Sequence, residues 1–270
     1  MKLFVDHRGN HGKNIVVFLH GGGVSGWMWE KQANHFEKDY NLLIPDLPGH
    51  GRSGHIPFES IAGAAEQIIR IIQAHAGEGA DITVIGFSLG AQILVQMLVM
   101  KPDLIRCAII SSALVRPIPI AKRLVKPTVR MTMPLIANKK FALLQAKQLY
   151  LDGEYFERYY QDSITMKPQN LVRVMQENMS FAIPSGFERC SARILVLVGA
   201  QEKKMMLQSA ADLVNTHPQA QGYIIPKIGH GVSLAVPELF DAIVEAWLQG
   251  KELPATLRPI LPYPAYKKGE

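Results

Sequence analysis

One serine stands in a setting that favours nucleophilic chemistry. Residues 86–90 read GFSLG, between a short apolar run at 81–85 and a segment of helical periodicity at 89–100. In such a G-x-S-x-G turn, the glycines remove side chains that would collide around a strained serine backbone. The Ser88 hydroxyl would then lie at a helix N-terminus, where the helix dipole favours developing negative charge. The pattern predicts that Ser88 is a nucleophile, rather than a serine in an ordinary glycine-flanked turn.

A glycine-rich loop supplies candidate hydrogen-bond donors for the same chemistry. The loop HGGG, residues 20–23, follows an apolar run that ends at Leu19. Two backbone N–H groups can hold a tetrahedral oxyanion, and losing one such donor typically costs ~10²–10³ in rate. We predict that Gly22, Gly23 and Leu89 form this oxyanion hole, and that His20 is structural. The competing interpretation is a tight turn that needs glycine for its own shape.

The candidate base is His230. When the base follows the nucleophile in the chain, it must come late, and only His217 and His230 lie beyond residue 190. His217 sits in a helix-to-strand connection, at the wrong end of a parallel sheet. His230 follows an apolar run at 223–225, and ligands of open α/β sheets bind where strands end. We therefore predict that His230 takes the proton of Ser88.

The candidate acid is Glu202, in the loop that follows the apolar run at 194–198. No aspartate occurs between Asp162 and Asp212, and Asp212 falls in the middle of a predicted helix. A triad accepts either carboxylate, so Glu202 is predicted to orient His230. The alternative is a surface glutamate that favours the first turn of a helix.

Short apolar runs that alternate with segments of helical periodicity must position these residues. Runs without internal alternation suit strands buried on both faces, and their order with helices indicates βαβ units. We predict an α/β fold, with a mostly parallel central sheet, helices on both faces and right-handed crossovers. Beyond a strand start at 1–6, the predicted strands are 14–19, 41–44, 81–85, 107–110, 194–198 and 223–225, and the predicted helices are 26–37, 58–75, 89–100, 203–215 and 237–248.

The alternation stops once, in a proline-interrupted stretch with only short helix-like pieces, such as 138–151 and 170–179. We interpret residues 114–190 as an inserted helical cap, or lid. Residues 1–113 and 191–250 form the predicted core. The proline-rich residues 251–270 are predicted to be an extended C-terminal tail.

The charge of the chain is concentrated in one segment. The net charge is +6, but the stretch from Arg116 to Lys147 holds eight Lys or Arg and no Asp or Glu, so the remainder carries 6 − 8 = −2. This distribution argues against a nucleic-acid-binding protein. We favour a solvated helical face for the segment. The alternatives are attraction of an anionic small-molecule substrate and, less favoured, contact with a membrane surface.

Other features of the sequence point to a cytoplasmic enzyme. The N-terminus lacks a basic stretch followed by an apolar run, and the apolar run at 91–100 is too short and too polar to span a bilayer. Two cysteines are too few for a disulfide framework. We expect no metal and no cofactor, and the oligomeric state stays open.

Together these residues resemble the α/β-hydrolase superfamily, from the loop at 20–23 to the predicted helix that ends near Leu248. The run PDLPGHGRS at 45–53 looks like the D-x-x-G-x-G-x-S loop of that superfamily. That loop mostly organises the rim of the site, so Asp46, His50 and Arg52 are expected to be structural. The chain is similar to small capped esterases, carbon–carbon bond hydrolases and cofactor-free haloperoxidase-like members, although Glu202 stands where aspartate is more usual.

The resemblance and the candidate residues imply a serine hydrolase with a Ser88-His230-Glu202 triad, a nucleophile elbow and a covalent acyl-enzyme. A small carboxylic ester is the favoured substrate. The alternatives are hydrolysis of a carbon–carbon bond, transfer of the acyl group to another acceptor, and a non-catalytic protein that binds a small apolar ligand on the same fold.

Overall fold

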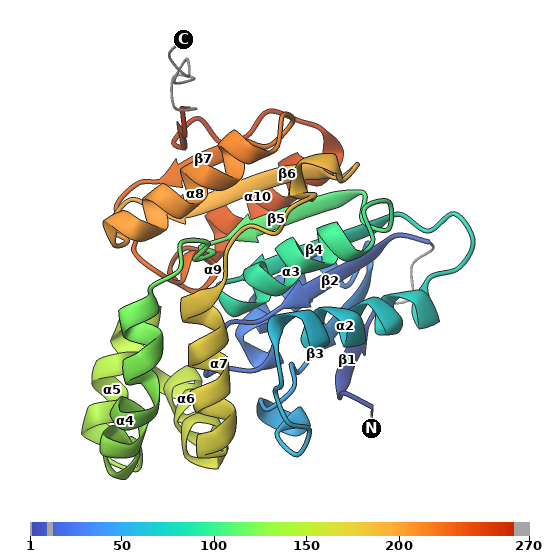
Figure 1. Cartoon of the computed structure of the whole chain (residues 1–270). Coiled ribbons are helices and arrows are strands. Elements are labelled where there is room, and N and C mark those ends of the chain that lie inside the picture. The colour runs from blue at the N-terminus through green and yellow to red at the C-terminus, as the bar shows by residue number, and fades with distance from the viewer. Residues whose placement is uncertain (1, 10–12, 262–270) are drawn as a thin grey trace.

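A single mixed sheet forms the centre of the computed structural model, which describes residues 2–9 and 13–261 (Figure 1). Its strand order is β1-β3-β2-β4-β5-β6-β7-β8, with all neighbours parallel except the β1–β3 and β7–β8 pairs at the two edges. The mostly parallel sheet predicted from the sequence is therefore confirmed. The strands are β1 (Val5–Arg8), β2 (Ile15–Leu19), β3 (Asn41–Pro45), β4 (Ile82–Phe87), β5 (Cys107–Ser111), β6 (Arg193–Gly199), β7 (Gln221–Ile225) and β8 (Arg258–Pro259).

Helices cover both faces of the sheet, because its central strands are apolar on both sides. Every residue of β2, β4 and β5 is buried. One apolar layer packs the sheet against α2 (Ile61–His75), α3 (Leu89–Met100) and α8 (Lys204–Thr216). The other packs it against α1 (Glu30–Phe36), α9 (Val232–Ala235) and α10 (Pro237–Gln249).

Four helices between β5 and β6 form a layer at one end of the sheet, in the segment interpreted as a cap (Figure 1). They are α4 (Pro119–Ile136), α5 (Lys139–Ala146), α6 (Gly153–Thr165) and α7 (Pro168–Ser180). Helix α4 packs on α7, and α5 packs on α6. None of the helices in the described residues is both long and apolar enough to cross a membrane.

The expectation that prolines divide this segment into short pieces is wrong for α4, which runs for 18 residues through Pro127 and Pro134. Both prolines are exposed and lie seven residues apart, hence on one face of the helix. Backbone carbonyls that lose their helical partner on an exposed face can bind water instead, which makes the prolines tolerable.

Helices α6 and α7 attach the four-helix layer to the sheet domain. The indole N–H of Trp27 donates to Asp162 Oδ2 at 2.7 Å, and Arg158 pairs with Glu30 at 3.0 Å. Burial raises the pKa of Asp162, although its hydrogen bonds from Trp27 and Ser25 oppose this rise. On α7, Asn170 and Glu177 accept hydrogen bonds from backbone N–H groups of the sheet domain. These contacts hold α6 and α7 against the sheet domain.

The proline-rich C-terminal segment joins the sheet in part. Strand β8 pairs with β7 in antiparallel fashion, with Arg258 opposite Ile224. Pro262 and Pro264 of the predicted tail lie outside the described residues.

Candidate active site

Ser88 occupies a strained turn between β4 and α3. Its backbone has φ 52° and ψ −110°, which is a sparsely populated conformation for a residue other than glycine. The flanking glycines are required by space: a Cβ on Gly86 would lie 2.5 Å from the Gly90 carbonyl oxygen, and one on Gly90 would collide with the Leu19 carbonyl. The strain is maintained because β4 and α3 are both tightly packed, and it presents the serine at the helix N-terminus.

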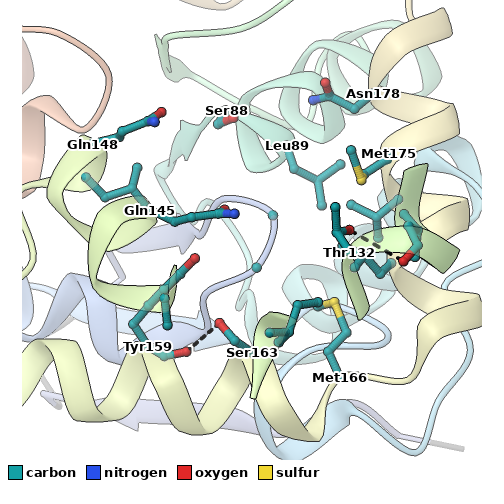
Figure 2. Close-up of a pocket in the computed structure, with 18 of the residues that line it drawn as sticks. Ser88, Leu89, Thr132, Gln145, Gln148, Tyr159, Ser163, Met166, Met175 and Asn178 are labelled. Atoms are coloured by element: carbon teal, nitrogen blue, oxygen red, sulfur yellow. Dashed lines mark hydrogen bonds between the residues drawn. The ribbon is translucent and has the colours of Figure 1, made fainter. Parts of the chain in front are cut away.

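The glycine-rich loop lies beside this turn. Gly22, Gly23 and Leu89, the residues predicted to form the oxyanion hole, line the same cavity as Ser88. Figure 2 shows Leu89 next to Ser88. Gly23 has φ +80°, which favours glycine.

His20 contacts the glycine-rich loop and is not among the residues that line the cavity. Its Nδ1 is 2.8 Å from the Gly21 carbonyl, and its Nε2 accepts a hydrogen bond from the Leu47 N–H at 2.9 Å. Complete burial lowers the pKa of His20 to about 4 and outweighs the hydrogen bond to Gly21. The ring is therefore neutral at pH 7 and connects the loops after β2 and β3.

The loop at 45–53 has a similar supporting geometry. Asp46 accepts hydrogen bonds from the backbone N–H groups of Gly26 and Arg52, each at 2.8 Å. Burial, with a smaller contribution from the neighbouring His20, lowers the pKa of His50 to about 3.

Glu202 and His230 meet across the ends of β6 and β7. His230 Nδ1 is 2.8 Å from Glu202 Oε2, and the Glu202 side chain is 1% exposed. The other carboxylate oxygen accepts hydrogen bonds from Ser112 Oγ at 2.6 Å and from the Gly199 N–H at 3.1 Å. Burial alone raises the pKa of Glu202, but the contacts with His230, Ser112 and Gly199 outweigh it and place the pKa below its ordinary value.

Ser112 is a member of this cluster that the sequence analysis did not single out. It follows β5 directly, and its backbone adopts φ 56°, in the left-handed region. Its place at the carboxyl end of a central strand is the signal that could have found it, since functional groups of parallel sheets gather there.

Ser88 and His230 both line the same cavity. The His230 ring lies 4.8 Å from the ring of Phe87, the residue before the nucleophile. Within the described residues, the Ser88 hydroxyl forms no hydrogen bond to His230. Such catalytic hydrogen bonds often tighten only when substrate is bound.

The cavity has a volume of about 510 Å³ and lies between the sheet domain and helices α4–α7 (Figure 2). Three of the methionines from the inserted segment line it: Met166, Met175 and Met179. No Lys, Arg, Asp or Glu is among the described lining residues, so the eight cations of residues 116–147 do not line it. Apart from Ser88 and His230, its polar side chains are Thr128, Thr132, Gln145, Gln148, Tyr159, Ser163 and Asn178.

The remaining alternatives for base and acid lie away from this cavity. His217 is buried and hydrogen-bonded to the Cys190 carbonyl at 3.0 Å. Asp212 pairs with Arg116, with Nη2 and Oδ1 2.8 Å apart.

Comparisons with known proteins agree with this architecture. A model of the alpha/beta hydrolase family matches residues 16–243. An (E)-2-((N-methylformamido)methylene)succinate hydrolase of Acinetobacter baylyi is 22% identical over 87% of this chain and 90% of its own length. A pimeloyl-[acyl-carrier protein] methyl ester esterase of Vibrio vulnificus is 22% identical, with coverages of 83% and 90%. A thermophilic esterase from Thermogutta terrifontis has a similar structure, with a TM-score of 0.77, 21% identity and coverages of 92% and 93%. Because the family model extends over most of the chain, this chain belongs to the alpha/beta hydrolase family.

Proposed function

We propose that this hydrolase cleaves small, uncharged carboxylic esters through a covalent acyl-enzyme on Ser88. The observation that carries the proposal is the hydrogen bond between His230 Nδ1 and the buried Glu202, beside a cavity that also exposes the strained Ser88. A carboxylate bound to Nδ1 fixes the proton there, so the Nε2 lone pair is the one available to a nucleophile.

In this mechanism the Ser88 Oγ proton moves to His230 Nε2 as Oγ attacks the ester carbonyl carbon. The carbonyl oxygen becomes an oxyanion, and we assign its stabilisation to the N–H groups of Leu89 and Gly22, with Gly23 as an additional candidate. Collapse of this intermediate breaks the ester C–O bond, and the leaving alkoxide takes the proton from His230. Water then repeats the sequence on the acyl-enzyme, which releases the acid and free Ser88.

The lining of the cavity supports the choice of an uncharged substrate. Burial of an unpaired carboxylate is expensive, and this cavity offers hydroxyl and amide groups but no cation that would pair with it. The names of two similar proteins, an esterase of Vibrio vulnificus and an esterase of Thermogutta terrifontis, agree with ester hydrolysis.

A fluorophosphonate probe tests the nucleophile. The wild type should be labelled, and Ser88→Ala should not. The matched control is Ser163→Ala, which removes another hydroxyl of the same cavity and should leave labelling intact. Equal labelling of the wild type and Ser88→Ala would place the nucleophile elsewhere. An unlabelled wild type would favour a binding protein on this fold. A panel of neutral esters and carbon–carbon substrates then separates the two hydrolytic reactions.

A further inference from the structure

Large apolar side chains are exposed mainly on the inserted helices. Of the ten with substantial exposure among the described residues, eight lie between Ile120 and Ile164, and only Met100 and Leu261 lie elsewhere. Single exposed apolar residues are ordinary, but a group on one segment marks an interaction surface. On α4, Ile120 is 74% exposed and Met131 73%, so half or more of each side chain lacks a protein neighbour.

These α4 residues form one stripe. Ile120, Leu124, Pro127, Met131 and Leu135 follow one another at intervals of four, three, four and four residues, which places them on one face of the helix. All five are exposed. The opposite face carries the buried Val125 and Val129, which pack inward. The stripe is therefore exposed to solvent. Helix α4, which carries it, lies with α5 on the left of the four-helix layer in Figure 1.

A row of cations runs beside the stripe. Arg123, Lys126 and Arg130 each precede a stripe residue by one position, so they lie about 100° further around the helix. All three are exposed, and within the described residues none of them forms an ion pair. No Asp or Glu occurs on α4 or α5. An apolar stripe beside Lys and Arg is the pattern of a helix that lies in the interface of a membrane.

The other border of the stripe belongs to the wall of the cavity. Thr128 and Thr132, on the side of the helix away from the cations, line the cavity, and Thr128 is also exposed. The order around α4 is therefore cations, apolar stripe, cavity wall and buried face. A surface that covered the stripe would lie next to the part of α4 that lines the cavity.

We propose that the outer face of α4 binds the surface of a bilayer that contains anionic lipids, with the stripe in the acyl-chain boundary and the cations at the phosphates. The charge of this face favours a bilayer over a second copy of the chain. Two copies of the face would bring their cations together, whereas an anionic lipid surface complements the cations. The proposal concerns the place of the reaction and does not depend on which residue is the nucleophile.

Vesicle flotation with the full chain tests this proposal. The wild type should bind vesicles of phosphatidylcholine with about 30% phosphatidylglycerol and should bind pure phosphatidylcholine far more weakly, with binding weakened by added salt. Each cation near an anionic surface strengthens binding roughly fivefold. Arg123→Glu with Arg130→Glu should therefore weaken binding about thirtyfold or more, and Leu124→Gln with Met131→Gln should weaken it about tenfold or more.

The matched control is Met100→Gln with Lys101→Glu, an exposed apolar–cationic pair at the far end of α3, which should bind as the wild type does. Circular dichroism and fluorophosphonate labelling should show that all variants are folded. Absence of binding by the folded wild type, or equal binding by the wild type and the Arg123/Arg130 variant, would overturn the proposal. The proposal would also be overturned if the wild type were a dimer that does not bind vesicles and the Leu124/Met131 variant were a monomer. A second copy of the chain would then cover the stripe.

Discussion

In our proposal, Glu202 takes the place in the triad where aspartate is more usual. The extra methylene adds a rotatable bond, so the side chain needs more contacts to hold a single orientation. The structure supplies two donors to Oε1, from Ser112 and Gly199, and leaves Oε2 for His230. Three hydrogen bonds to a buried carboxylate also stabilise its charged form. In our proposal, Ser112 is a positioning residue that acts through Glu202.

Removal of the Ser112 hydroxyl should therefore slow the reaction without weakening substrate binding. A hydrogen bond to a charged group contributes about 1.5–3 kcal/mol, so Ser112→Ala should lower kcat by about tenfold or more. KM should stay near the wild-type value, because Ser112 does not line the cavity. Glu202→Gln is the reference variant, and its kcat should fall by about 10⁴ as for a triad Asp→Asn change. Steady-state kinetics on a neutral ester measure both. An unchanged kcat in Glu202→Gln would remove the carboxylate from the mechanism.

At the scale of elements, the sequence predicts those parts that rely on local rules. The helix predicted at 89–100 has the observed bounds of α3, because a G-x-S-x-G turn and a long apolar run define it. The two parallel-sheet strands that precede the glycine loop and Ser88 are likewise placed to within two residues. Helices α4 and α6 were missed. Proline is a breaker in isolation, and the inward face of α6 carries Tyr155, Phe156 and Tyr159, which are half-buried aromatic residues and not an aliphatic core stripe.

The candidate site also has a part that local sequence rules predict and a part that depends on tertiary contacts. Ser88, Glu202 and His230 follow the ends of β4, β6 and β7, so residue type and position in the chain are sufficient to select them as candidates. The contact of Ser112 with Glu202 joins residues 90 positions apart and depends on an unusual backbone conformation. No local pattern in the sequence encodes such a pairing.

The loops after β2 and β3 are joined by a neutral histidine, and this makes their stability sensitive to acid. The pKa of His20 is about 4 in the folded chain, below about 6.5 in an unfolded one. The unfolded chain therefore binds a proton first, and the free energy of unfolding falls as the pH drops from about 6.5 to 4. The loss from His20 alone should be about 3 kcal/mol, at 1.36 kcal/mol for each pKa unit.

Urea denaturation at several pH values measures this effect. The control is His20→Gln, whose amide retains a donor and an acceptor but does not titrate. Its stability should be lower at pH 7 but should fall less steeply below pH 6.5, with the remaining slope due partly to His50. A variant that loses stability as steeply as the wild type between pH 6.5 and 4 would show that His20 is not the group responsible.

At the scale of the whole molecule, the excess of positive charge and the cavity lie on different surfaces. The excess of cations lies on exposed faces of α4 and α5, whereas the cavity lining holds hydroxyl, amide and apolar groups. The cations can attract an anionic substrate over a distance. Only the cavity lining can contact the substrate during the reaction. These two effects respond differently to salt, since exposed charges are screened within about 10 Å at 0.1 M ionic strength.

This separation determines how the enzyme should treat an anionic ester. The nitrophenyl ester of valerate and the mono-nitrophenyl ester of succinate have acyl groups of similar length. Only the succinate ester carries a carboxylate. In 0.5 M salt, kcat/KM for the valerate ester should exceed that for the succinate ester by about tenfold or more, because the carboxylate loses its hydration without gaining a cation. In low salt the gap should narrow, because the cationic face then raises the encounter rate with the anion. Arg123→Glu with Arg130→Glu should remove that narrowing and leave the valerate ester unaffected. A faster succinate ester at high salt would mean that a cation reaches the bound substrate, and the assignment of an uncharged substrate would then be wrong.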